Sequence, residues 1–160
     1  MGASGTNTAW RFPLRQEGLK LSAGEIVQTW NRANGGHGIA RLEQHVVGKI
    51  RQWRPDVIFT HPADPRGNDP LGYLINQIVL AAMEKAADAA QYPDQMSVAG
   101  LAPWNVKKLY SVLPAGQQGT VSITTAQLAP RLGDSLADRA ATARGLLVGR
   151  HQTSPASLDR

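Results

Sequence analysis

The sequence predicts an α/β domain with a mainly parallel sheet. Two helical patterns fill residues 22–53, the short apolar run "DVIFT" follows at 56–60, and another helical pattern separates it from a second apolar run at 106–113. Short strands that alternate with helices of this length are typical of parallel βαβ units.

The first helix is predicted to begin at "SAGE", Ser22–Glu25, whose spacing is that of a capping box. Ile26, Val27 and Trp30 supply its apolar positions. The "NGG" at 34–36 is a stop signal, because glycine accepts the left-handed conformation that ends helices.

The second helix covers "GIARLEQHVVGKIRQW" at 38–53 and has the clearest helical period in the chain. Its apolar stripe consists of Ile39, Leu42, Val46, Ile50 and Trp53. We expect it to end at Arg54-Pro55, because a residue before proline avoids the α region.

The run at 56–60 is rich in β-branched and aromatic residues, so we expect a strand buried on both faces. A polar loop follows at 61–68. Asp69-Pro70 is predicted to start a third helix, with aspartate as N-cap and proline at the first helical position. This helix should run to about residue 89, with its buried stripe at Leu74, Ile75, Ile78, Val79, Ala82 and Met83.

The rest of the chain is predicted to hold a loop over "YPDQMSVAGLAPW", a strand at 106–113, an edge strand over "TVSITT" at 120–125 and a last helix capped by Asp134. The apolar face of this last helix would carry Leu136, Ala140, Ala143 and Leu147. We expect residues 1–150 to form a single domain and residues 151–160 a disordered tail.

Composition excludes several kinds of chemistry. The chain has 160 residues, a net charge of +5 and no cysteine, so disulfides, thiolate catalysis and cysteine-ligated zinc are excluded. The basic residues are scattered, which predicts no nucleic-acid partner. No apolar run has the length of a membrane span, and we expect a cytoplasmic protein.

Polar side chains gather in the loop after the strand at 56–60. Ligands of open α/β sheets bind at the carboxyl ends of strands, so His61, Asp64, Arg66, Asn68 and Asp69 are the candidate site. Four of them also have a structural alternative. Asp69 caps the helix, Arg66 is solvated or pairs with Asp64, and His61 bonds backbone in a turn. Trp104 could stack on a sugar face or cover the core.

The stretch "RPDVIFTH" at 54–61, with "IVLAA" at 78–82 and "PWNVKKLY" at 103–110, resembles the PIG-L/LmbE-like family of zinc-dependent N-deacetylases. The resemblance covers residues 50–110 well and the last third loosely. It implies a Rossmann-like three-layer fold, a zinc cofactor and hydrolysis of the acetamide of an N-acetylglucosamine-type sugar or sugar conjugate.

Two departures from the family pattern concern the metal. The "AHPDD" signature, which supplies two zinc ligands and the general base, has no counterpart here, and the only "HP" is His61-Pro62. The family's "HPDH" falls on residues 68–71, where the last ligand becomes Leu71. The chain is therefore either a truncated copy without its N-terminal metal-binding part or a branch that has drifted from zinc chemistry, and we assign no metal ligand.

By this resemblance, Asp64 and Asp69 are the candidate catalytic carboxylates. His61, Arg66, Asn68 and Trp104 are the candidate substrate-binding residues. Two functions stay open: an N-acetyl-sugar deacetylase, or a non-catalytic module that binds a carbohydrate or a partner. An unrelated α/β domain remains a third alternative.

Overall fold

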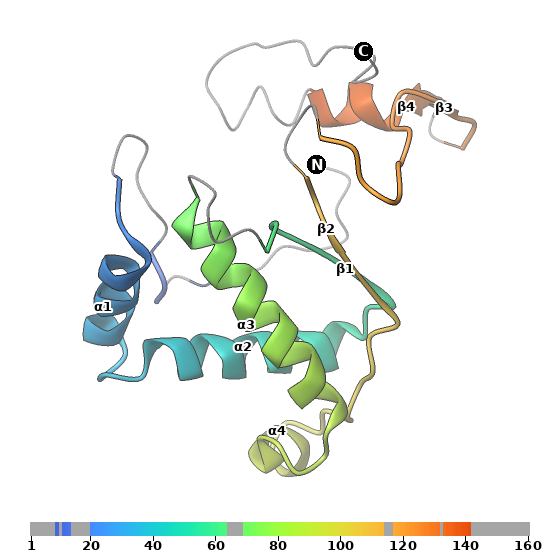
Figure 1. Ribbon diagram of the computed structural model, residues 1–160. Helices are drawn as coiled ribbons and strands as arrows, with labels where there is room; N and C mark the ends of the chain where they lie inside the picture. The colour runs from blue at the N-terminus through green and yellow to red at the C-terminus, as the bar shows by residue number, and fades with distance from the viewer. Residues whose placement is uncertain are drawn as a thin grey trace. The chain divides into compact units, whose positions relative to one another are not determined.

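The computed structural model describes residues 9, 11–13, 20–63, 69–113, 117–131 and 133–141 (Figure 1). They belong to two compact units, one of Ala9–Leu113 and one of Met1–Thr8 with Pro114–Arg160. Helices and a small parallel sheet make up the larger unit, so the structure mixes helices and strands and is compatible with the predicted α/β class. No helix in the described ranges is long and apolar enough to cross a membrane.

Helix α1 (Ala23–Ala33) begins with the predicted capping box. The Ser22 hydroxyl accepts from the Glu25 N–H at 3.3 Å, and the Glu25 carboxylate accepts from the Ser22 N–H at 2.8 Å. The helix ends at Asn34, and Gly35 and Gly36 follow with positive φ angles of 62° and 86°. The start and stop signals of this helix are therefore confirmed.

Helix α2 (Gly38–Trp53) has the predicted bounds and ends at Arg54, which takes a left-handed conformation. Its predicted stripe is wrong at Trp53, which is 56% exposed. In the last turns the buried face turns instead toward Val47 and Arg51, because there the helix packs beside the C-terminal part of α3.

Strand β1 (Val57–Thr60), helix α3 (Pro70–Ala87) and strand β2 (Lys108–Ser111) form a βαβ unit. The strands pair in parallel, with Val57 opposite Lys108 and Thr60 opposite Ser111. The predicted strand, its parallel partner and the helix start at Asp69-Pro70 are confirmed.

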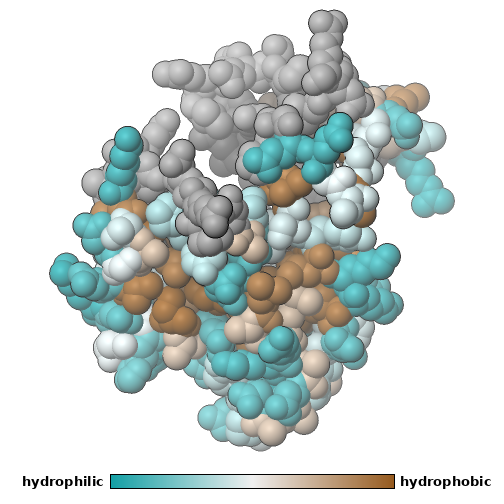
Figure 2. All heavy atoms as spheres, in the orientation of Figure 1, coloured by the Kyte–Doolittle hydropathy of each residue, from teal (hydrophilic) through white to brown (hydrophobic). Residues whose placement is uncertain are grey.

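The expectation that β1 is buried on both faces is wrong. Val57 is 39% exposed and Phe59 is 55% exposed, whereas Ile58 packs on the core and Thr60 is buried. Helix α3 packs against the strand from one side, and within the described ranges β2 is its only neighbouring strand. Figure 2 shows apolar side chains at the surface around α3 and the strands, with hydrophilic ones around them.

Three expectations for later segments are wrong. The predicted loop after residue 91 contains a short helix, α4 (Pro93–Ser97), which begins with proline and carries an acidic residue in its first turn. Residues 120–125 form no strand and are exposed throughout, and none of the described strands pairs with them. Strands β3 (Leu128–Ala129) and β4 (Asp134–Ser135) pair instead.

The last helical segment, described at 136–141, is capped by Ser135 rather than by Asp134. The Ser135 hydroxyl accepts from the Asp138 N–H at 3.0 Å and donates to the Asp138 carboxylate at 2.6 Å. Asp134 lies one position earlier, in β4. The apolar positions 143 and 147 and the tail at 151–160 lie outside the described residues.

Two apolar clusters form the core of the larger unit. The first lies where α1, α2 and α3 meet and contains Phe12, Ile26, Trp30, Leu42 and Ile78. The second lies between α2, the C-terminal half of α3 and the segment before β2, and contains Val47, Ile50, Ala82, Ala86 and Val106. Together they fix α3 across α2 (Figure 1).

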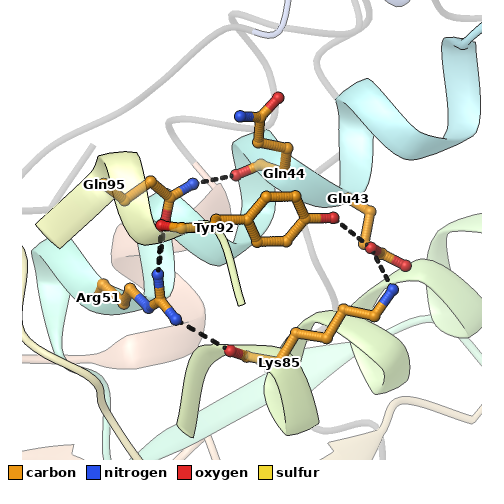
Figure 3. A network of polar contacts seen from close by, with 6 residues as sticks. All are labelled: Glu43, Gln44, Arg51, Lys85, Tyr92 and Gln95. Atoms are coloured by element: carbon orange, nitrogen blue, oxygen red, sulfur yellow. Dashed lines mark hydrogen bonds and ion pairs between the residues drawn. The ribbon is translucent and has the colours of Figure 1, made fainter. Parts of the chain in front are cut away.

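The Arg51 side chain, only 2% exposed, ties α2 to the end of α3 and to α4. Its guanidinium donates to the backbone carbonyls of Lys85, Ala86, Asp88, Gln91 and Tyr92, at 2.8–3.4 Å. A sixth contact reaches the side-chain oxygen of Gln95 at 3.1 Å (Figure 3). The charge is thus balanced by carbonyl dipoles at a helix C-terminus, where a cation is favoured.

Beside it, Glu43 of α2 accepts from the Lys85 ammonium at 2.6 Å and from the Tyr92 hydroxyl at 2.5 Å (Figure 3). Burial alone would raise the Glu43 pKa, but the hydrogen bonds from Lys85 and Tyr92 and the lysine charge outweigh it, so the pKa is lowered. Burial, the bond to Glu43 and its charge raise the pKa of Tyr92 to about 12.

Replacing Arg51 should destabilise the chain strongly. In Arg51→Met, several buried carbonyls lose their donor, and each unsatisfied group costs about 1–3 kcal/mol, so the unfolding free energy should fall by at least about 3 kcal/mol. Urea unfolding followed by circular dichroism measures this. Arg32→Met, at an exposed arginine of α1, is the matched control and should change stability by less than about 0.5 kcal/mol. Equal effects of the two variants would contradict this role.

The stability contributed by Glu43 should depend on pH. Its pKa is lower in the folded chain than the 4.5 of the unfolded one, so this stability is present above pH 4.5 and is lost as the pH falls through the folded value. Glu43→Gln should therefore be less stable than the native chain at pH 7, and the difference should shrink at acid pH in urea titrations. Glu84→Gln, at an exposed glutamate of α3, is the control. A difference that stays constant with pH would refute the assignment.

Candidate functional site

The carboxyl ends of β1 and β2 lie side by side and carry the candidate site. Thr60 ends β1 opposite Ser111, which ends β2, and the chain leaves β1 at His61. Helix α3 begins at this end, so Asp69 lies close to His61. The predicted position of His61, directly after the carboxyl end of a parallel strand, is thus confirmed.

His61 and Asp69 are the two predicted site residues that the structure brings together. The imidazole Nδ1 lies 3.8 Å from a carboxylate oxygen, Oδ2, and the side chains are 54% and 61% exposed. They form an ion pair when His61 is protonated. Both groups are therefore within reach of a molecule arriving from solvent.

Asp69 also has the structural role that the sequence offered as the alternative. Its Oδ1 accepts from the Gly72 N–H at 2.9 Å and caps the first turn of α3. The other oxygen, Oδ2, faces His61. One carboxylate thus both caps the helix and faces the strand end, and the capping bond fixes its position.

Asn76 of α3 holds the strand end by hydrogen bonds. The sequence analysis did not identify this residue as part of the site. Its side chain is 1% exposed, and its amide donates to the backbone carbonyl of His61 at 2.7 Å and to the Ser111 hydroxyl at 3.5 Å. It joins α3 to both strands. An amide among the apolar stripe residues of α3 was the available signal, because a buried amide needs partners.

The Thr60 hydroxyl is a further polar group at this end. Its oxygen is buried, and it has no hydrogen-bond partner among the described residues. A buried hydroxyl without a partner costs free energy. The Thr60 hydroxyl can therefore still donate and accept a hydrogen bond at the end of β1.

The other predicted site residues lie apart or outside the described residues. Asp64, Arg66 and Asn68 belong to the undescribed segment 64–68. Trp104 packs against the second core cluster, donates to the Pro55 carbonyl at 2.8 Å, and has the Arg54 guanidinium 4.5 Å from its ring centre. Pro55 and His61 are six residues apart along β1, about 20 Å in an extended strand, so the structure does not bring the indole to the strand end.

The described residues do not complete a zinc site. Zinc needs about three protein donors and an open position. At the strand end, His61 and Asp69 offer two donors, and Leu71 packs its apolar side chain against the first core cluster. No group of three or more His, Cys, Asp or Glu side chains that could hold a metal exists in the described ranges.

Of the other histidines, the two that the structure describes, His37 and His45, do not join this cluster. His37 precedes α2, is exposed and makes no capping bond through its side chain. His45 is half-buried on α2, where burial and then the positive charge of Lys49 lower its pKa. His151 lies outside the described residues.

A scan against protein-family models found no match to this chain. A search of curated proteins and a search of solved structures found none either.

Gly72 packs closely against the side chain of Asp69, the N-cap of α3, and a substitution can test this contact. A β-carbon there would lie 2.4 Å from Asp69 Oδ2 and 3.0 Å from His61 Nδ1. Alanine normally stabilises a helix by about 1 kcal/mol over glycine. Gly72→Ala should lose that gain in the native background because it displaces the capping carboxylate, but should recover it in the Asp69→Ala background. The unfolding free energies of the native chain, the two single variants and the double variant test this. If the effects of the two substitutions simply add, the contact between the β-carbon and the carboxylate is contradicted.

Proposed function

We propose that this chain is a Rossmann-like domain of the PIG-L/LmbE type, located in the cytoplasm, that binds an N-acetyl sugar or sugar conjugate at the carboxyl ends of β1 and β2. The observation that carries the proposal is the exposed pair of His61 and Asp69 at this end of a parallel βαβ unit. Parallel α/β sheets bind their ligands at this position.

The chemistry of the pair suits a ligand rich in hydroxyl groups. An imidazole can donate through one nitrogen and accept through the other, and a carboxylate accepts from hydroxyls. The Asp69 carboxylate is held by its bond to Gly72, and the backbone from which the His61 side chain extends is held by Asn76, so these parts of the site are fixed before a ligand arrives. A fixed site binds more tightly because less conformational entropy is lost.

Binding without hydrolysis by this chain alone is the function that the geometry supports best. Hydrolysis in the family that the sequence resembles relies on zinc to activate water and polarise the amide. The described residues offer two donors for such an ion, and the position of the third ligand is occupied by Leu71 in the core.

Deacetylation is the second candidate, favoured by the same pair together with "RPDVIFTH" at 54–61. In that case Asp69 and Asp64, which lies outside the described residues, would supply the carboxylates that move protons. A zinc content of about one ion per chain and release of acetate from N-acetylglucosamine would support it. Neither is expected if the domain only binds.

The test of the binding proposal is a titration of the full chain with N-acetylglucosamine, followed by amide NMR. We expect saturable shifts at His61, Asp69 and the first turn of α3. His61→Ala should weaken binding about fivefold or more, since it removes one hydrogen bond to the ligand. His37→Ala is the matched control, because that histidine is exposed and lies outside the cluster. Absence of saturable shifts at the strand end, or equal weakening by the two variants, would overturn the proposal.

A further inference from the structure

A separate groove runs along the polar face of α2. It has a volume of about 440 Å³ and is open to solvent. Arg41, His45 and Lys49, each four residues apart, line it from one face of the helix. His61, Asp69, Asn76 and Ser111 do not line it.

Hydrogen bonds hold the opposite walls of the groove in place. Gln95 of α4 donates to the Gln44 carbonyl at 2.9 Å and accepts from Arg51 at 3.1 Å (Figure 3). A β-carbon on Gly48 would lie 3.3 Å from the Gln95 amide nitrogen, so the glycine lets α4 approach α2 closely. On the other side, Asn34 donates to the carbonyl of Arg11 at 3.2 Å, and both residues line the groove. The concave shape is therefore built into the packing of α4 and residues 11–12.

The charge that lines the groove has one sign. Arg11, Arg41 and Lys49 contribute cations, and none of the described lining residues is acidic. Glu43, on the neighbouring face of α2, is already paired with Lys85. The groove thus concentrates positive potential in a concave surface, which attracts anions.

Two of these cations keep donors available for a ligand. The Arg41 side chain is exposed and makes no hydrogen bond or ion pair with any residue that the structure describes. The Lys49 ammonium donates to the Gln52 side chain at 2.8 Å, and an ammonium has three donors. The lowered pKa of His45, caused first by burial and then by the Lys49 charge, fits a site where positive groups converge.

We propose that this groove binds the phosphate group of a small phosphorylated molecule. The planar guanidinium of Arg41 matches phosphate oxygens in a two-bond geometry, and Lys49 supplies a point charge on the same face. The Gln52 side chain lies in the same lining, and its amide N–H groups can donate to hydroxyl groups of the attached molecule. The volume is that of a small-ligand site.

The experiment titrates the full chain with inorganic phosphate, with glucose 6-phosphate and with glucose, at constant ionic strength, and follows the amide NMR signals of α2. We expect saturable shifts along residues 41–49 with the two phosphates and none with glucose. The pKa of His45 should rise when phosphate is bound, because a nearby anion favours the charged imidazole.

Two variants make the test specific. Arg41→Gln should weaken phosphate binding about fivefold or more, because it removes charge-assisted hydrogen bonds. Arg32→Gln carries the same change of net charge, lies on α1 outside the groove, and should leave binding unchanged. Both positions are exposed, so both variants should fold. Equal weakening by the two variants, shifts outside the groove only, or no saturation by phosphate would overturn the proposal.

Discussion

The buried guanidinium of Arg51 is the interaction on which the larger unit depends most. Arg51 is only 2% exposed, and burying its charge costs much free energy unless its N–H donors find hydrogen-bond partners. Here the partners are carbonyls at the end of α3 and the start of α4, so the side chain satisfies the last turn of one helix and anchors the next. The carbonyls of Lys85, Ala86 and Asp88 that accept from Arg51 lie at the C-terminal end of α3, so these bonds hold that end of the helix against α2. The Asp69 carboxylate lies at the other end of α3, where its bond to the Gly72 N–H holds it beside His61.

Among the described elements of the larger unit, α3 covers one face of the parallel pair β1–β2. The uncovered face carries Phe59 and Tyr110, whose rings stack with centroids 5.6 Å apart and an angle of 24° between their planes. This stacking shields part of the apolar area that a second layer would cover in a three-layer fold. The same half-covered arrangement leaves the carboxyl ends of both strands accessible, with Asn76 supporting them from the helix side.

Local signals in the sequence were enough to predict most of the elements. The capping box at Ser22, the glycines after Asn34 and the Asp69-Pro70 start each act within a few residues, and the structure has all of them. The strand-end location of His61 followed from the same local order.

Contacts between distant segments were not predictable from the sequence. Helix α2, for example, is capped by the Asn31 side chain of α1 and not by His37: the Asn31 oxygen accepts from the Gly38 N–H at 2.8 Å. The burial of Arg51 and Asn76 has the same origin, since each is stabilised by partners at least 15 residues away. The expected burial of Phe59 failed because it assumed a neighbouring layer that an apolar run cannot specify by itself.

The central claim is that the end of the parallel strand pair is a ligand site and not only a capped turn. A crystal structure of the full chain with N-acetylglucosamine tests it most directly. The account predicts density for the sugar within hydrogen-bond distance of the His61 imidazole and the Asp69 carboxylate, above the ends of β1 and β2. A crystal in which the sugar is ordered elsewhere, or in which this end is covered and closed to solvent, would contradict it.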